Sequence, residues 1–155
     1  MRKLHFLVPL LYLLAASAAL RFTLLGGGYW DGVLAKPAGA PTTWAFALSW
    51  PLFYLLAAWS FLLFAGQAAG SASFGAGVRV YLMQAVLGVS FSYLFFVRQL
   101  LGPAVLVAAF FAGSIVLAMI LARPHSFRAT LVALPCFLWG AFLTSLAHEI
   151  FQLNR

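Results

Sequence analysis

Uninterrupted apolar segments, each long enough to cross a bilayer, dominate this chain of 155 residues. Hydrophobic residues make up 65% of the sequence and charged residues 7%, which is far from the composition of a water-soluble domain. A spanning helix needs about 20 residues, so the chain has room for five. We therefore predict an all-α integral membrane protein, a five-helix up-and-down bundle in one domain over residues 1–155. The helices are expected at about residues 4–25, 44–65, 80–97, 100–122 and 129–151.

Charged and helix-breaking residues set the boundaries between these helices. Residues 66–77 are rich in glycine and serine and are expected to form a loop after the second helix. The connections near residues 102–103 and 123–126 are short, so the helices that they join are expected to be antiparallel neighbours. A β-barrel is disfavoured, because the apolar segments are continuous and do not alternate with polar residues.

The first apolar segment has a second interpretation. Met1-Arg2-Lys3, the apolar stretch and the small residues 16–18 also match a signal peptide with its cleavage site. Cleavage would leave four helices, and the family resemblance described below uses the first one. We therefore expect the segment to be retained.

Charge and cysteine content restrict the classes of partner. The net charge is +7, but the nine lysines and arginines stand singly or in pairs at the edges of the apolar segments, which is typical of helix-end anchors in a lipid bilayer. The sequence has no basic stripe, so a nucleic-acid partner is not expected. Cys136 is the single cysteine, which excludes an internal disulfide and a cysteine-based metal site.

Signatures of catalysis are sparse. The two carboxylates, Asp31 and Glu149, are far apart in the sequence, so a paired-carboxylate mechanism would need the fold to bring them together. The motifs of serine hydrolases, phosphate-binding loops and zinc proteases are absent from the sequence. His148 is interpreted as an interfacial anchor, with an axial ligand to a haem-like iron as the alternative. No catalytic and no metal-binding residue is predicted.

Aromatic residues make up 17% of the sequence and are concentrated in the second helix. Trp50, Tyr54 and Phe61 are spaced so that they share one helix face, whereas Trp59 lies off it. Trp44 fits an aromatic belt at the membrane interface. Trp50 and Tyr54 are deeper by about 9 to 15 Å, so a cavity for a flat, apolar ligand explains them better than a belt does.

Further polar and aromatic positions extend this pattern along the chain. Gln84 is an uncharged polar residue at membrane depth, and such residues usually face the interior of a bundle. The pattern consists of Trp30, Leu34-Ala35-Lys36-Pro37, Pro41, Trp44, Phe46, Trp50, Tyr54, Tyr81, Gln84, Phe91-Ser92-Tyr93-Leu94-Phe95-Phe96, Pro135, Trp139, Ala141, Thr144, Leu146 and Leu153-Asn154. In these residues and their order the chain resembles the translocator protein family (TspO/MBR), also called tryptophan-rich sensory proteins.

The resemblance implies a five-helix bundle, commonly a homodimer, with a cavity under the first loop that binds porphyrins, sterols and synthetic benzodiazepine-type ligands. The positions that match Trp30, Trp50 and Trp139 line or cap that cavity in such proteins. The ligand-binding residues expected here are Trp30, Trp44, Phe46, Trp50, Tyr54, Gln84, Gly88, Phe91, Cys136, Trp139, Ala141 and Thr144.

Three positions depart from the family pattern. Gly88 stands where an asparagine is usual, Cys136 where a tyrosine is frequent, and Ala147 where another asparagine is frequent. These replacements remove two amides and a phenol, so a different ligand preference is expected. The family's weak cholesterol-type motif near the C-terminus is also missing.

The function expected from the residues and the resemblance is non-enzymatic binding of a tetrapyrrole, such as protoporphyrin IX or haem, or of another flat hydrophobic molecule such as a sterol. The protein would act as a sensor, carrier or scavenger in a bacterial inner membrane, with no cofactor required. Two alternatives stay open: light-dependent porphyrin degradation involving Trp30 or Trp50, and a structural role in the assembly of another membrane complex.

Overall fold

The computed structural model describes residues 2–155, and it describes side chains from Leu7 onward. Every regular element in this part of the chain is helical, and five helices are long and apolar enough to cross a membrane, which confirms the predicted fold class. The elements are α1 (Arg2–Leu25), α2 (Gly27–Gly32), α3 (Thr43–Ala68), α4 (Phe74–Ser92), η1 (Tyr93–Val97), α5 (Leu101–Ala122) and α6 (Phe127–Leu153).

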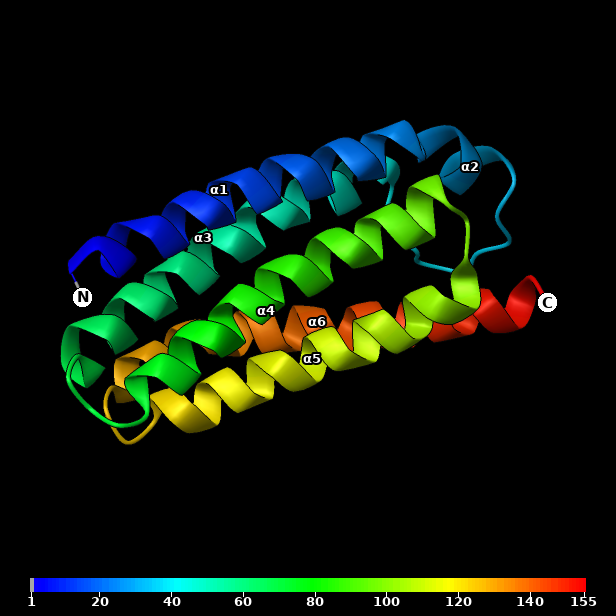
Figure 1. The fold of residues 1–155 in the computed structure, drawn as a ribbon. Helices are drawn as coiled ribbons and strands as arrows, with labels where there is room; N and C mark the ends of the chain where they lie inside the picture. Colours follow the sequence, from blue (N-terminus) through cyan, green and yellow to red (C-terminus); the bar gives the residue numbers. More distant parts are fainter. Residues whose placement is uncertain (1) are drawn as a thin grey trace.

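The five long helices form a closed ring in which α1 contacts α3 and α4, α3 contacts α6, and α5 lies between α6 and α4. Figure 1 shows that the two termini lie at opposite ends of the bundle, as an odd number of spans requires. Helix α1 contributes Val8, Tyr12 and Ala19 to the buried core, so it is an integral part of the bundle.

The turn between α3 and α4 is shorter than the sequence predicted. Helix α3 extends to Ala68 and α4 begins at Phe74, six residues before the predicted start at residue 80. The reason is packing: the Phe64 and Phe74 rings stack with centroids 6.2 Å apart, and Phe64 lies where a Cβ at Gly77 would be. Tertiary contacts therefore override the low helix propensity of this glycine-rich stretch.

Two other helix starts are set by capping side chains. Thr42 and Ser126 have extended backbones, and their hydroxyls accept hydrogen bonds from the amides of Ala45 and Ala129, both at 3.3 Å. Such caps satisfy amide groups that a helix leaves free at its N-terminus. Helices α3 and α6 accordingly begin one and two residues earlier than predicted.

The two ends of the bundle differ. Helix α2, residues 33–42 and η1 gather at the end where the C-terminus lies (Figure 1). The short turns 69–73 and 123–126 lie at the other end, where the Ser73 hydroxyl and His125 Nε2 are hydrogen bonded at 2.7 Å. The segments at the C-terminal end, α2, residues 33–42 and η1, therefore cover the helix ends nearest Trp30 and Phe46.

Candidate ligand-binding site

Aromatic rings from six elements, α2, α3, α4, η1, α5 and α6, meet inside the bundle below residues 33–42. We call this group the aromatic cluster; it comprises Trp30, Phe46, Trp50, Phe53, Phe91, Phe95, Phe96, Phe111 and Trp139. All of these rings except Trp139 are buried. Their edge-to-face and tilted arrangements are those that aromatic quadrupoles favour.

Trp50 lies at the centre of the cluster and has no exposed surface. Its ring centroid is 6.0 Å from that of Phe111, 6.2 Å from that of Phe91 and 6.4 Å from that of Trp139. Its indole N–H donates to the Thr23 hydroxyl on α1 at 3.1 Å. Trp50 is therefore fixed both by ring contacts and by a buried hydrogen bond.

Trp30 closes the cluster from the short helix α2. Two residues that are adjacent in sequence, Phe95 and Phe96, both pack on its ring, with centroids 5.9 and 5.6 Å away. They lie in the π-helical segment η1, and such segments are frequent at functional sites. Gly26 makes this approach possible, because a Cβ there would overlap Phe96.

Residues 33–42 are held over the cluster by polar contacts. Lys36 Nζ donates to the Trp30 carbonyl at 2.6 Å, lies 3.7 Å from an Asp31 carboxylate oxygen and sits over the Trp30 ring. The Asn154 side chain exchanges two hydrogen bonds with the backbone of Ala35, at 3.0 and 2.9 Å. This end of the site is thus closed by contacts from both α2 and the C-terminus.

Partial burial raises the pKa of the Tyr29 phenol, which precedes Trp30 in α2, above its ordinary value. A phenol is already neutral at physiological pH, so this shift keeps Tyr29 neutral to a higher pH. The charged residues that contact Trp30 or its neighbour are Lys36, through its hydrogen bond to the Trp30 carbonyl, and Asp31, which pairs with Lys36.

Tyr54 forms the boundary of the cluster on the side of α1. Its ring contacts Trp50 and Phe53, and its hydroxyl donates to the Ala85 carbonyl on α4 at 3.0 Å. The hydroxyl oxygen lies where a side chain at Gly88 would be, since a Cβ there would be only 2.5 Å from it. The space that a side chain at residue 88 would take is thus filled by the Tyr54 hydroxyl.

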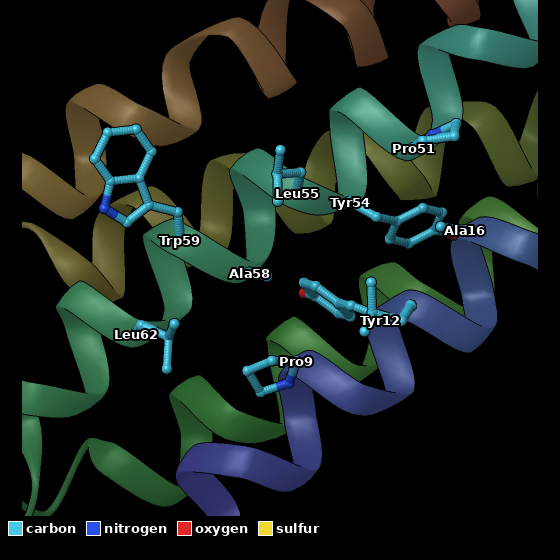
Figure 2. A pocket seen from close by; sticks show the side chains of 10 residues that line it. Pro9, Tyr12, Ala16, Pro51, Tyr54, Leu55, Ala58, Trp59 and Leu62 are labelled. Atoms are coloured by element: carbon cyan, nitrogen blue, oxygen red, sulfur yellow. The ribbon is translucent and has the colours of Figure 1, made fainter.

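An apolar groove of about 490 Å³ lies on the other side of Tyr54, between α1 and α3. Figure 2 shows Tyr12 and Tyr54 facing each other at its floor, with Pro9 on one helix and Ala58 and Trp59 on the other. The groove is open to the lipid, and its volume is in the usual range for small-molecule sites, about 300 to 1,000 Å³. None of the described residues that line it is charged.

A cavity of about 100 Å³ lies between α3 and α6, next to Trp139. Cys136 lines it, and the Cys136 thiol donates weakly to the Phe53 carbonyl at 3.7 Å. The indole N–H of Trp139 is buried and has no hydrogen-bond partner within the described part of the chain. Buried polar atoms normally have a partner, so this unpaired N–H is a candidate donor for a ligand.

The remaining predicted site residues lie outside the cluster. Trp44 is 64% exposed at the start of α3, in the position of an interfacial belt, and Ala141 is exposed on α6. Gln84 donates to the Ser114 carbonyl on α5 at 3.2 Å, and Thr144 donates to Gly140 within its own helix at 2.8 Å. His148, the alternative axial ligand, is exposed.

Several ring-bearing and groove residues were missed by the sequence interpretation. Phe111 could have been found, because it belongs to a row of buried residues on α5 at spacings of three and four: Ala104, Ala108, Phe111, Ile115, Ala118 and Ala122. The groove residues of α3 show the same spacing of three and four in the sequence: Pro51, Leu55, Ala58 and Leu62. Trp59 was set aside as off the aromatic face, but it forms the rim of the groove.

Two comparisons with known proteins extend these observations. The sequence model of the TspO/MBR family matches residues 6–153. The chain is also similar to the uncharacterized membrane protein YtaB of Bacillus subtilis (strain 168), with 31% identity over 129 residues, which is 81% of this chain and 80% of the relative.

Proposed function

Because this chain belongs to the TspO/MBR family, we propose that it is a membrane binding protein for flat hydrophobic molecules, with tetrapyrroles such as protoporphyrin IX or haem as the leading class and sterols as the second. It would act as a sensor, carrier or scavenger. Its multi-pass architecture and its Bacillus relative are consistent with a bacterial inner membrane.

The observation that carries the proposal is the set of rings around Trp50, with the free N–H of Trp139 at its edge. Stacked rings offer a large apolar surface to a planar ligand, and the indole N–H offers one hydrogen bond. A tetrapyrrole carries carboxylates that can accept such a bond, and these are also the groups that Lys36 could neutralise.

Binding requires the rings to move apart. The cavity beside Trp139 is about 100 Å³, which is smaller than sites for drug-sized ligands. The ligand would therefore stabilise a conformation in which the cluster is open, and its apparent affinity would be reduced by the rarity of that conformation.

Titration with protoporphyrin IX tests this function directly. In detergent-solubilised protein, the porphyrin should quench tryptophan fluorescence saturably. Trp50→Ala should weaken binding by about 5- to 30-fold, which corresponds to about 1 to 2 kcal/mol for a stacked ring. Trp44→Ala, an exposed residue of the same helix, is the matched control and should leave the affinity unchanged.

Two results would contradict the proposal. Equal affinities for the wild type and a folded Trp50→Ala variant would place the ligand elsewhere. Quenching that never saturates would mean that porphyrin only partitions into the micelle.

Light-dependent breakdown of bound porphyrin is a second candidate. It is favoured by the contact between Trp50 and Trp139, which would place two oxidisable indoles beside one ligand. Illumination of the complex distinguishes the two functions, because a binding protein leaves the porphyrin spectrum unchanged apart from ordinary bleaching. Replacement of Trp50 by phenylalanine should slow an indole-dependent loss.

The homodimer that the family resemblance implies is also a proposal. The mass of the protein–detergent complex, measured by light scattering with the detergent contribution subtracted, would distinguish a dimer from a monomer.

A further inference from the structure

Tyr54 separates two regions that a ligand could occupy. Its ring contacts Trp50 of the cluster, and it also lines the groove between α1 and α3, where Figure 2 shows it. We propose that Tyr54 is a gate between groove and cluster, held closed where its hydroxyl sits against Gly88, and that the groove is the port through which a ligand enters from the lipid. This inference rests on the proposed function.

The closed position depends on the absence of a side chain at residue 88. A Cβ at Gly88 would lie 2.5 Å from the Tyr54 hydroxyl oxygen and 3.2 Å from ring atoms of both Trp50 and Phe111. Contacts at 2.5 Å are not tolerated, so any larger residue would displace the tyrosine. The hydroxyl itself is held by one hydrogen bond, to the Ala85 carbonyl.

The groove is the space into which a displaced Tyr54 ring can move. The facing ring, Tyr12, lies 5.6 Å from it edge to face and is anchored by a 2.7 Å hydrogen bond to the Tyr81 carbonyl. Tyr12 has the shorter hydrogen bond of the two tyrosines, 2.7 Å against 3.0 Å for Tyr54, and the small residues Ala16 and Ala58 leave space in the groove. Tyr54, with the longer bond, is the part of this boundary that we expect to move.

The position of the groove suits a ligand that arrives through the lipid. Its residues lie within 9–16 of α1 and 51–62 of α3, in the middle of both helices, so it opens into the hydrocarbon core. Approach to the cluster from the end of the bundle is closed by residues 33–42, which Lys36 and Asn154 hold with several polar contacts. A lateral route has to break one hydrogen bond, whereas the route past residues 33–42 has to break several.

Two variants that release the gate provide the first test. The association rate of protoporphyrin IX, measured by stopped-flow quenching in micelles, should rise about fivefold in Tyr54→Phe, because one hydrogen bond that opposes opening is lost. It should rise at least as much in Gly88→Ala. The control is Gly113→Ala on α5, which makes the same change where nothing lies within 4 Å and should leave the rate unchanged.

A variant that fills the groove provides the second test. Ala58→Phe places a ring in the port and should lower the association rate about tenfold, whereas Ala109→Phe, on the lipid-facing side of α5, should not. The proposal is overturned if the two gate variants do not both bind faster than the Gly113→Ala control, or if Ala58→Phe binds as fast as Ala109→Phe.

A measurement without porphyrin separates failure of the gate from failure of the proposed function. Phosphatidylcholine with bromine near the middle of its acyl chains quenches tryptophans that it can reach. In vesicles of this lipid, Gly88→Ala should increase quenching of the buried tryptophans relative to Gly113→Ala. Increased quenching with no saturable porphyrin binding would retain the gate and reject the ligand; equal quenching would reject the gate.

Discussion

The aromatic cluster and the groove are neighbours across one side chain, yet they are built in opposite ways. The cluster contains large rings in mutual contact, so it is closed although it is rich in the residues expected of a binding site. The groove, between α1 and α3, contains two alanines and two prolines among its lining residues, and it is open. Abundant rings therefore do not create a cavity; small residues on facing helices do.

The difference also concerns polar atoms. In the cluster, Trp50 and Trp30 donate to Thr23 and Pro41, and the Trp139 N–H has no acceptor in the described structure. In the groove, both tyrosine hydroxyls are engaged with backbone carbonyls. The cluster is thus the region that can offer a directional contact to a ligand, while the groove offers apolar surface.

The largest expected difference between the two regions is in stability. Trp50→Ala should lower the free energy of unfolding by about 3 to 5 kcal/mol, because it leaves a cavity in a fully packed region. Trp59→Ala, at the rim of the groove with 56% of the side chain exposed, should change it by about 0.5 kcal/mol at most. Unfolding by sodium dodecyl sulfate in mixed micelles, followed by circular dichroism, measures both; similar losses would show that the cluster is not more tightly packed than the groove.

A smaller effect is expected when Trp50 loses its acceptor but keeps its ring. Thr23→Val preserves the shape of the side chain and leaves the Trp50 N–H buried without a partner, which should cost about 1 to 3 kcal/mol. Thr130→Val is the control, because the Thr130 hydroxyl only donates, to Met119 at 3.3 Å, and its loss strands no donor. The same unfolding assay applies, and equal effects would mean that the Trp50 hydrogen bond contributes little.

Cys136 reports on opening of the cluster itself. It is buried beside Trp139, and maleimides react with an exposed thiolate, so labelling should be at least about tenfold slower than in a Cys136→Ala/Ala38→Cys control, whose thiol is exposed. Bound protoporphyrin should slow labelling by a small neutral maleimide further. Mass spectrometry follows the reaction, and labelling that is unaffected by porphyrin would place the ligand away from α6.

The sequence predicts features of the fold that depend on one segment at a time better than features that depend on contacts between segments. The five spans follow from hydropathy and charge, which act on each segment separately, and they were predicted to within a few residues except at the start of α4. That start depends on Phe74 packing against Phe64, a contact between segments that no local rule contains. The short helix α2 and the π-helical η1 were missed for the same reason.

For the candidate site, the sequence predicted which residues bind a ligand, which stays a prediction, and the structure shows which of those residues lie together. Trp30, Phe46, Trp50, Phe91 and Trp139 do lie together, while Trp44, Gln84, Ala141 and Thr144 do not. The sequence also identified Gly88 as unusual but not its consequence. That consequence depends on where the Tyr54 hydroxyl lies, which only the packing of α3 against α4 determines.

The smallest expected effect on stability is at Trp139, where binding measurements can distinguish a hydrogen bond to the ligand from ring stacking. The Trp139 N–H has no partner in the described structure, so Trp139→Phe removes no hydrogen bond and should change the free energy of unfolding by about 0.5 kcal/mol or less. Its effect should appear in binding. If the N–H serves as the polar handle for a carboxylate, Trp139→Phe should weaken protoporphyrin IX binding by about fivefold or more, since hydrogen bonds to charged groups are stronger than neutral ones. Etioporphyrin, which has the same ring system without carboxylates, should bind the variant and the wild type nearly equally. An equal loss for both porphyrins would assign Trp139 to stacking alone, and no loss for either would remove it from the site.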